Sequence, residues 1–171
     1  MNTLEKPAQY FHLIGAEDKE VLRRVQQTLV AAKFHMSDEQ RNLSFVNAYV
    51  EYLLRQRNKL MYVVEGPTAP AGIITFHNII PGWKADGQWC VWDWTGWGPT
   101  RIRAGRQMVE TVEKLCKLHY IRTWTADDRV LRLLTHFVSF TEEGLQKEAF
   151  AQDDKLYDVH LLVRHTGEQH V

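Results

Sequence analysis

Residues 88–120 read QWCVWDWTGWGPTRIRAGRQMVETVEKLCKLHY, and this stretch carries the signals that decide the fold. Gln88–Trp94 is rich in β-prone residues and places aromatics on both faces, so it predicts a strand that is covered on both sides. The Trp-Gly-Pro step at 97–99 predicts a turn. From Arg101 to Tyr120, apolar residues recur at helical spacing and predict a long amphipathic helix. A strand, a tight turn and a long helix therefore follow one another directly.

The segments on either side of this stretch alternate between strand and helix patterns. The turn-forming residues Glu65–Thr68 separate two short β-prone runs, and Gln152–Lys155 predicts the turn of a hairpin. The predicted elements are strands at 60–64, 71–77 and 121–125, a short helix at 130–138, and an antiparallel hairpin with arms at 145–150 and 156–163.

Two more helices are predicted before the first strand. Apolar residues form one stripe from Asp18 to Lys33, and a second stripe follows residue 38. Ser37 and Gln40 have the spacing of a capping box, so the second helix is expected to start near Asp38. No internal repeat or linker divides the chain, and we predict a single domain over residues 1–171.

Composition excludes several classes of protein. The hydrophobic share of 44% and the charged share of 25% are those of a globular chain. The 21 basic residues balance 21 acidic ones, so no overall field would gather nucleic acid or an anionic membrane. Cys90 and Cys116 lie in apolar stretches and predict reduced thiols in a cytoplasmic protein. No signal peptide, membrane-spanning stretch or metal-ligand spacing is found, and we predict no metal.

The order of these elements resembles that of the GNAT acyltransferases over roughly residues 10–164. The sharper likeness is near the carboxyl end, where Thr125-Ala126-Asp127-Asp128-Arg129 precedes a short helix, Phe140 ends it, and Thr141–Gly144 follows. Residues 156–162 resemble the final strand of the ribosomal-protein type of N-acetyltransferase. The resemblance implies an α/β (α+β) fold with a mixed, mostly antiparallel twisted sheet flanked by about four helices.

The same resemblance implies an activity and a cosubstrate. Members of the family move an acetyl group from acetyl-CoA to a primary amine, so both are implied as partners here, with a homodimer as an open possibility. The pantetheine arm would contact Asp93, Trp94 and Thr95. The diphosphate would lie at the amino end of the long helix, against Arg101, Ile102, Arg103, Ala104, Gly105 and Arg106.

This helix start departs from the family's pattern, Gln/Arg-x-x-Gly-x-Gly/Ala. Aligned from Arg101, the final small residue is replaced by Arg106; a register from Gly98 to Arg103 fits no better. Three arginines at a helix amino end are unfavourable unless an anion neutralises them. They could hold phosphate through their side chains, or they could be solvated.

Three residues are candidates for the chemistry. Asp93 could take the amine's proton if burial raises its pKa, or its carboxylate could simply be satisfied by nearby backbone. Asp128 matches the family's turn asparagine and is another candidate base, although capping of the helix that follows is the preferred interpretation. Thr135 replaces the tyrosine that many members use as an acid. The altered helix start and this missing tyrosine leave a second hypothesis open, a catalytically silent module that binds CoA or assembles with other proteins.

Overall fold

The computed structural model describes residues 10–15, 18, 20–21, 24 and 58–166. Seven strands form one sheet in the order β1-β2-β3-β4-β5-β7-β6. The strands are β1 (Phe11–Ile14), β2 (Leu60–Glu65), β3 (Pro70–Ile80), β4 (Lys84–Val91), β5 (Tyr120–Thr125), β6 (Thr141–Gln152) and β7 (Lys155–His165). Two helices are described, α3 (Pro99–Cys116) and α4 (Asp128–Phe137).

Five of the six neighbouring pairs are antiparallel, and short turns connect three of these pairs, β2–β3, β3–β4 and β6–β7. Gly82, with φ of +76°, lies in the turn between β3 and β4. Asp153 and Asp154 both have positive φ and form the two-residue turn of the β6–β7 hairpin, as the sequence predicted. The one parallel pair is β4 and β5, and helix α3 is the crossover that this direction requires.

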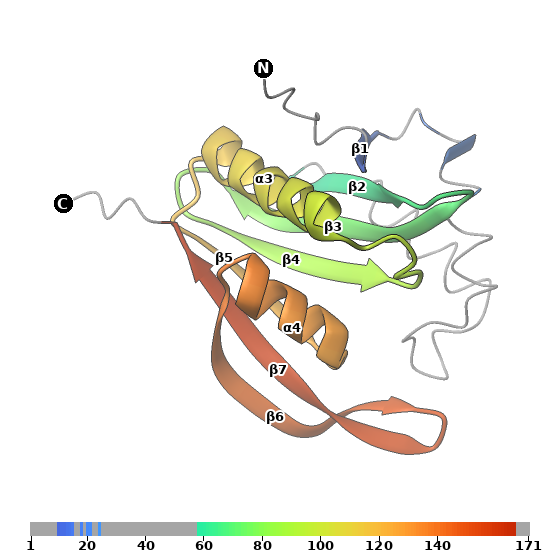
Figure 1. The fold of residues 1–171 in the computed structure, drawn as a ribbon. Coiled ribbons are helices and arrows are strands. Elements are labelled where there is room, and N and C mark those ends of the chain that lie inside the picture. Colours follow the sequence, from blue (N-terminus) through green and yellow to red (C-terminus); the bar gives the residue numbers. More distant parts are fainter. Residues whose placement is uncertain (1–9, 16–17, 19, 22–23, 25–57, 167–171) are drawn as a thin grey trace.

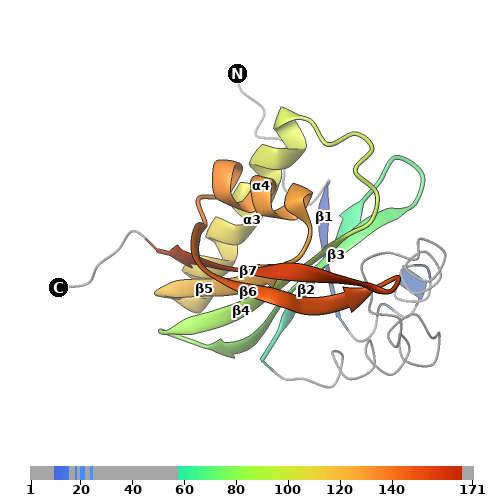
Figure 2. The ribbon, with the colours of Figure 1, turned by 90° about the horizontal axis from the view of Figure 1, so that it is seen from below.

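Both described helices cover the same face of the sheet (Figure 2). In Figure 1, α3 lies over the β2–β4 side and α4 beside β5. Helix α3 turns Ala104, Met108, Val109 and Val112 into the core, and α4 contributes three buried apolar side chains. A smaller apolar cluster on the opposite face contains Ile14, Met61, Val63 and Ile73.

The pairing of β4 with β5 stops before either strand ends. Their ladder runs from Lys84 opposite Tyr120 to Gly87 opposite Thr123. Beyond this rung β4 continues along β3 as far as Val91, while β5 continues along β7. We call the resulting opening the splay and the Gly87–Thr123 rung its apex. In Figure 1 the β6–β7 hairpin accordingly runs off at an angle to β4.

The α/β class and the mostly antiparallel sheet confirm the prediction, with boundaries that differ. The four-residue strand β1 was missed, because so short a segment shows no clear alternation. Strand β4 ends at Val91, so Asp93–Thr95 lie in a loop. Helix α3 begins two residues early, at Pro99, because proline suits a first helical position. The hairpin begins at Thr141 instead of residue 145.

Of the about four helices expected, two fall mainly outside the described residues. Glu20, Val21 and Arg24 are helical, in agreement with the first predicted helix. Asp18, its expected first residue, is not helical, and the rest of that segment is not described. The second predicted helix, from Asp38, lies wholly outside the described residues. No described helix is long and apolar enough to cross a membrane.

Candidate active site

The splay leaves one edge of β4 without a strand partner. Gln88–Val91 pair with β3 on one side, and no described strand pairs with them on the other. At its far end the chain bends over β3, where the N–H groups of Trp92 and Asp93 both donate to the Ala71 carbonyl. An extended ligand inserted here could bond to the open edge as a further strand would.

The loop that leaves β4 is held by Asp93. Its carboxylate accepts a hydrogen bond from the Thr95 N–H at 2.8 Å. Hydrogen bonds from Thr95, together with the nearby Arg101 charge, lower the pKa of Asp93 below its usual value. The expectation that burial raises this pKa is therefore wrong, and the alternative of a carboxylate satisfied by backbone is confirmed.

Arg101 is the most unusual residue at the helix start. Its side chain is only 6% exposed and lies between the rings of Tyr10 and Trp97, at 5.4 Å and 5.8 Å. Nη1 donates to the Thr95 carbonyl at 3.1 Å, whereas the buried Nε has no hydrogen-bond partner among the described residues. A buried cation with an unused donor is a strong anion ligand, because it has already left water.

The other residues expected around the diphosphate point elsewhere. Arg103 and Arg106 are exposed, and Arg106 pairs with Glu110 one turn further on at 2.9 Å. Ala104 and Gly105 are buried against the core. A Cβ at Gly105 would lie 3.2 Å from Phe11 Cζ, so this glycine lets α3 approach β1 closely. Because the helix starts at Pro99, residues 104–106 belong to its second turn.

The first turn of α3 retains unpaired donors. The first hydrogen bond in the helix runs from Ile102 N–H to the Gly98 carbonyl, so the N–H groups of Thr100 and Arg101 have no partner within the helix. Gly98 provides no side-chain cap, and the turn contains no acidic residue. The positive end of the helix dipole thus remains available to an anion.

Tryptophans join this helix start to the other side of the splay. The rings of Trp94 and Trp97 are 4.9 Å apart, and Arg129 of α4 lies 5.4 Å from the Trp94 ring. The buried indole N–H groups of Trp94 and Trp97 have no acceptor among the described residues. Two more donors therefore lie beside Arg101, at the mouth of the splay.

Helix α4 begins where β5 ends, beside the splay. Asp127, the residue before the helix, accepts from the Arg129 N–H at 2.8 Å and so supplies the cap that was assigned to Asp128. Asp128 is exposed in the first turn. The Thr135 hydroxyl donates to the Leu131 carbonyl at 2.8 Å, within its own helix. The sequence prediction did not single out Asp127, although its place before a helix was a capping signal.

Several solved acetyltransferase structures superpose on this fold over nearly their whole length. A spermidine N-acetyltransferase from Vibrio cholerae, solved with CoA and spermine, superposes with a TM-score of 0.70 at 15% identity, covering 92% of this chain and 96% of that one. A ribosomal alpha-N-protein acetyltransferase in complex with coenzyme A gives 0.69 at 18% identity, covering 91% and 94%. An acetyl transferase from Salmonella typhimurium that modifies the N-terminal serine of a 50S ribosomal protein gives 0.66 at 16%, covering 94% and 97%.

The chain has the GNAT fold. Neither the protein-family models nor the curated protein sequences contain a match to it. The order of elements and the mostly antiparallel sheet seen here are those of these acetyltransferases, as the resemblance in sequence implied.

Arg101 lies at the start of α3, where the sequence departs from the GNAT pattern. The Arg101 side chain is buried at the start of the helix and is bonded to the loop that precedes it, with Nε left as an unused donor. The open backbone edge of β4 and the unpaired donors at the start of α3 are the groups to which an acyl-CoA could bond. At the diphosphate end, the fit depends on the Arg101 guanidinium acting as a ligand.

Proposed function

We propose that this protein is an acetyl-CoA-dependent N-acetyltransferase that acts on a primary amine. The observation that carries the proposal is the splay, where β4 keeps an open backbone edge over Gln88–Val91 after its ladder with β5 has ended. The pantetheine arm would lie along this edge, beside Asp93, Trp94 and Thr95, with its thioester near the apex. Structural neighbours solved with CoA support this assignment.

The diphosphate would be bound by side chains more than by backbone. Arg101 contributes its unpaired Nε, and Thr100 and Arg101 contribute two backbone N–H groups. The charge-assisted bonds of a guanidinium to phosphate are about twice as strong as neutral ones. The next residues of the helix beside this site are Ile102 and Arg103. Helix packing uses Ala104 and Gly105, and the helix surface carries Arg106.

The chemistry is direct transfer between the two substrates. The neutral amine attacks the thioester carbonyl carbon, a C–N bond forms, the C–S bond breaks, and the thiolate leaves as coenzyme A. A base must remove one amine proton. Asp128, exposed at the start of α4, is the better candidate, since the lowered pKa of Asp93 makes it a weak base. The Thr135 hydroxyl, if it turned away from Leu131, could donate a hydrogen bond to the leaving sulfur.

Two measurements test the proposal on the full chain. Acetyl-CoA at about 100 times its Kd should stabilise the folded state by roughly 2.7 kcal/mol, visible as a rise in Tm. Release of free coenzyme A in the presence of a panel of primary amines should then exceed the rate without amine. No rise in Tm at millimolar acetyl-CoA would remove the proposal.

A silent GNAT-fold module is the second candidate, favoured by the burial of Arg101 at the diphosphate position. That candidate predicts a protein that gives no thiol release with any amine. Binding of acetyl-CoA without release of coenzyme A would indicate a CoA-binding module. Absence of both binding and release would indicate a role in protein assembly. The two measurements above separate these outcomes.

We further propose that the protein works in the cytoplasm, without nucleic acid or membrane, and that two copies can form a homodimer. Support for a dimer comes from the β6–β7 hairpin, where Leu145, Leu156 and Tyr157 are exposed next to the sheet edge formed by β6. Light scattering at several protein concentrations tests it, and a monomer at all of them would exclude it.

A further inference from the structure

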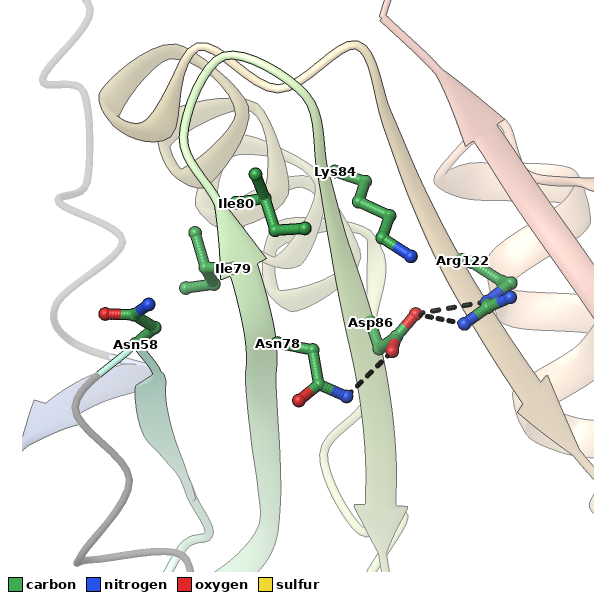
Figure 3. A pocket seen from close by; sticks show the side chains of 7 residues that line it. All are labelled: Asn58, Asn78, Ile79, Ile80, Lys84, Asp86 and Arg122. Atoms are coloured by element: carbon green, nitrogen blue, oxygen red, sulfur yellow. Dashed lines mark hydrogen bonds and ion pairs between the residues drawn. The ribbon is translucent and has the colours of Figure 1, made fainter.

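A cavity of about 580 Å³ lies on the sheet face opposite α3 and α4, at the start of β4 and β5 (Figure 3). Five of its seven lining residues are polar, and they come from three strands and the segment before β2. The lining residues are Asn58, Asn78, Ile79, Ile80, Lys84, Asp86 and Arg122. None of them belongs to the candidate acetyl-CoA site described above.

This cavity is adjacent to the apex of the splay. Asp86 and Arg122 form the rung immediately before Gly87 and Thr123. Because strand side chains alternate between faces, Asp86 points away from the helices while Gly87 faces them. The next residues on the cavity side, Gln88 and Trp124, are exposed, and Trp124 is 48% exposed. A molecule in the cavity would therefore lie next to the rung at which the strands part, on the face opposite α3 and α4.

The one carboxylate in the cavity wall is already neutralised. Asp86 is only 4% exposed, and its Oδ1 accepts from Arg122, with Nε at 3.1 Å and Nη2 at 2.9 Å. Its Oδ2 accepts from Asn78 Nδ2 at 3.0 Å. Asn78 adopts a φ of +49° at an irregularity in β3, and its amide reaches across to β4. Asp86 consequently has little charge left to attract a cationic ligand.

Lys84 provides the charge that remains. Its side chain extends toward the Asp86–Arg122 pair in Figure 3, and its ammonium lies 5.0 Å from the Trp83 ring. No carboxylate of the described residues forms an ion pair with Lys84. The Arg122 side chain is 39% exposed, so one side of its guanidinium also faces solvent. With two cations and one carboxylate, the described wall has a net charge of +1.

We propose that this cavity binds the acceptor and selects an amine that also bears an anionic group, such as a carboxylate. Lys84 is the main contact to that group and the outer side of Arg122 the second. Asn58 and Asn78 offer amide groups to the rest of the molecule. This inference rests on the proposed acetyl transfer, in which an acceptor must approach the apex. It also implies discrimination against polyamines, whose charges would meet Lys84 and Arg122.

Binding of two amines to the full chain tests the inference directly. L-Glutamate carries two carboxylates and spermidine none, and the Kd of each is measured by calorimetry in the presence of CoA. Wild-type protein should bind L-glutamate more tightly than spermidine. Lys84→Glu should weaken L-glutamate binding by about tenfold or more and strengthen spermidine binding, because the charge at the cavity is reversed. Lys155→Glu is the matched control, since Lys155 is exposed on the distant hairpin and should leave both Kd values unchanged.

The outcomes of these measurements distinguish failure of the cavity assignment from failure of the transferase proposal. Equal L-glutamate binding by wild type and Lys84→Glu, or tighter binding of spermidine by wild type, overturns the inference. Coenzyme A release with each amine is measured separately. If L-glutamate binds through Lys84 but no amine releases coenzyme A, the cavity assignment stands as a binding site while the transferase proposal fails. If coenzyme A is released but Lys84→Glu leaves the KM values of both amines unchanged, only the cavity assignment fails.

Discussion

Arg164 of β7 donates two hydrogen bonds to the carboxylate of Glu113 in α3, from Nε at 2.6 Å and from Nη2 at 3.1 Å. Both side chains are buried, and Arg164 Nη1 also donates to the Val138 carbonyl after α4. Helix α3 follows β4, whereas β7 pairs with β5. This ion pair therefore ties together the two halves of the sheet that part at the splay.

Glu113→Ala should destabilise the fold strongly, because it leaves the Arg164 charge buried without a partner. Loss of one member of a buried pair costs about 3–5 kcal/mol. Unfolding in urea measures this, with Glu110→Ala as the control. Glu110 is 35% exposed and 4.0 Å from Arg164, so its removal should cost about 1 kcal/mol or less. Equal losses in the two variants would contradict the role given to Glu113.

Arg101→Ala should weaken CoA binding by roughly 10- to 100-fold, the worth of charge-assisted hydrogen bonds to phosphate. Arg106→Ala is the control and should bind CoA normally, since Arg106 is exposed and paired with Glu110. S-acetylpantetheine, which lacks the diphosphate, should bind wild type and Arg101→Ala equally. If Arg101→Ala instead tightens CoA binding, the arginine obstructs the site and is no ligand.

Asp93→Asn should lower stability at neutral pH and lose this effect in acid. Hydrogen bonds from Thr95 hold the pKa of Asp93 below its usual value of 3.8. The unfolded state therefore takes up a proton first as the pH falls, so the stabilisation is complete above the usual pKa and is lost as pH falls through the lowered one. Tm measured from about pH 6 down to about pH 2.5 should show the two proteins converging. A difference in Tm that stays constant with pH would exclude the Asp93 carboxylate as the source of the stabilisation.

Cys90 should be inert toward thiol reagents in the folded protein. Burial, with a contribution from the Asp127 charge, raises the pKa of the Cys90 thiol to about 12, so almost no thiolate exists at about pH 8. Burial also raises the pKa of Cys116. A colorimetric thiol reagent should react slowly with the native protein and rapidly after denaturation. Loss of a fast reaction of the native protein in Cys90→Ala would assign that reaction to Cys90. It would show that the β4 side of the splay opens readily.

Local patterns in the sequence were sufficient for most elements of the sheet and for α3. The periodicity of residues 101–120 and the β-prone runs around them depend only on neighbours in the chain, and so does the Asp153-Asp154 turn. The fold class was implied by the resemblance of their order to that of the GNAT acyltransferases. The four-residue strand β1 could not be predicted in this way, because it is defined by pairing with β2, about 50 residues away.

The sequence by itself therefore determined most of the succession of helices and strands, since the periodicity and turn signals of those elements are set within a few residues of chain. Only the tertiary structure decided the site: that Asp93 is bound by its own loop, that Arg101 is buried between Tyr10 and Trp97, and that Asp86 meets Arg122, 36 positions away. The physical reason is that burial and charge pairing depend on which strands lie side by side. A side chain's solvation, and with it its chemistry, is fixed only when the sheet assembles.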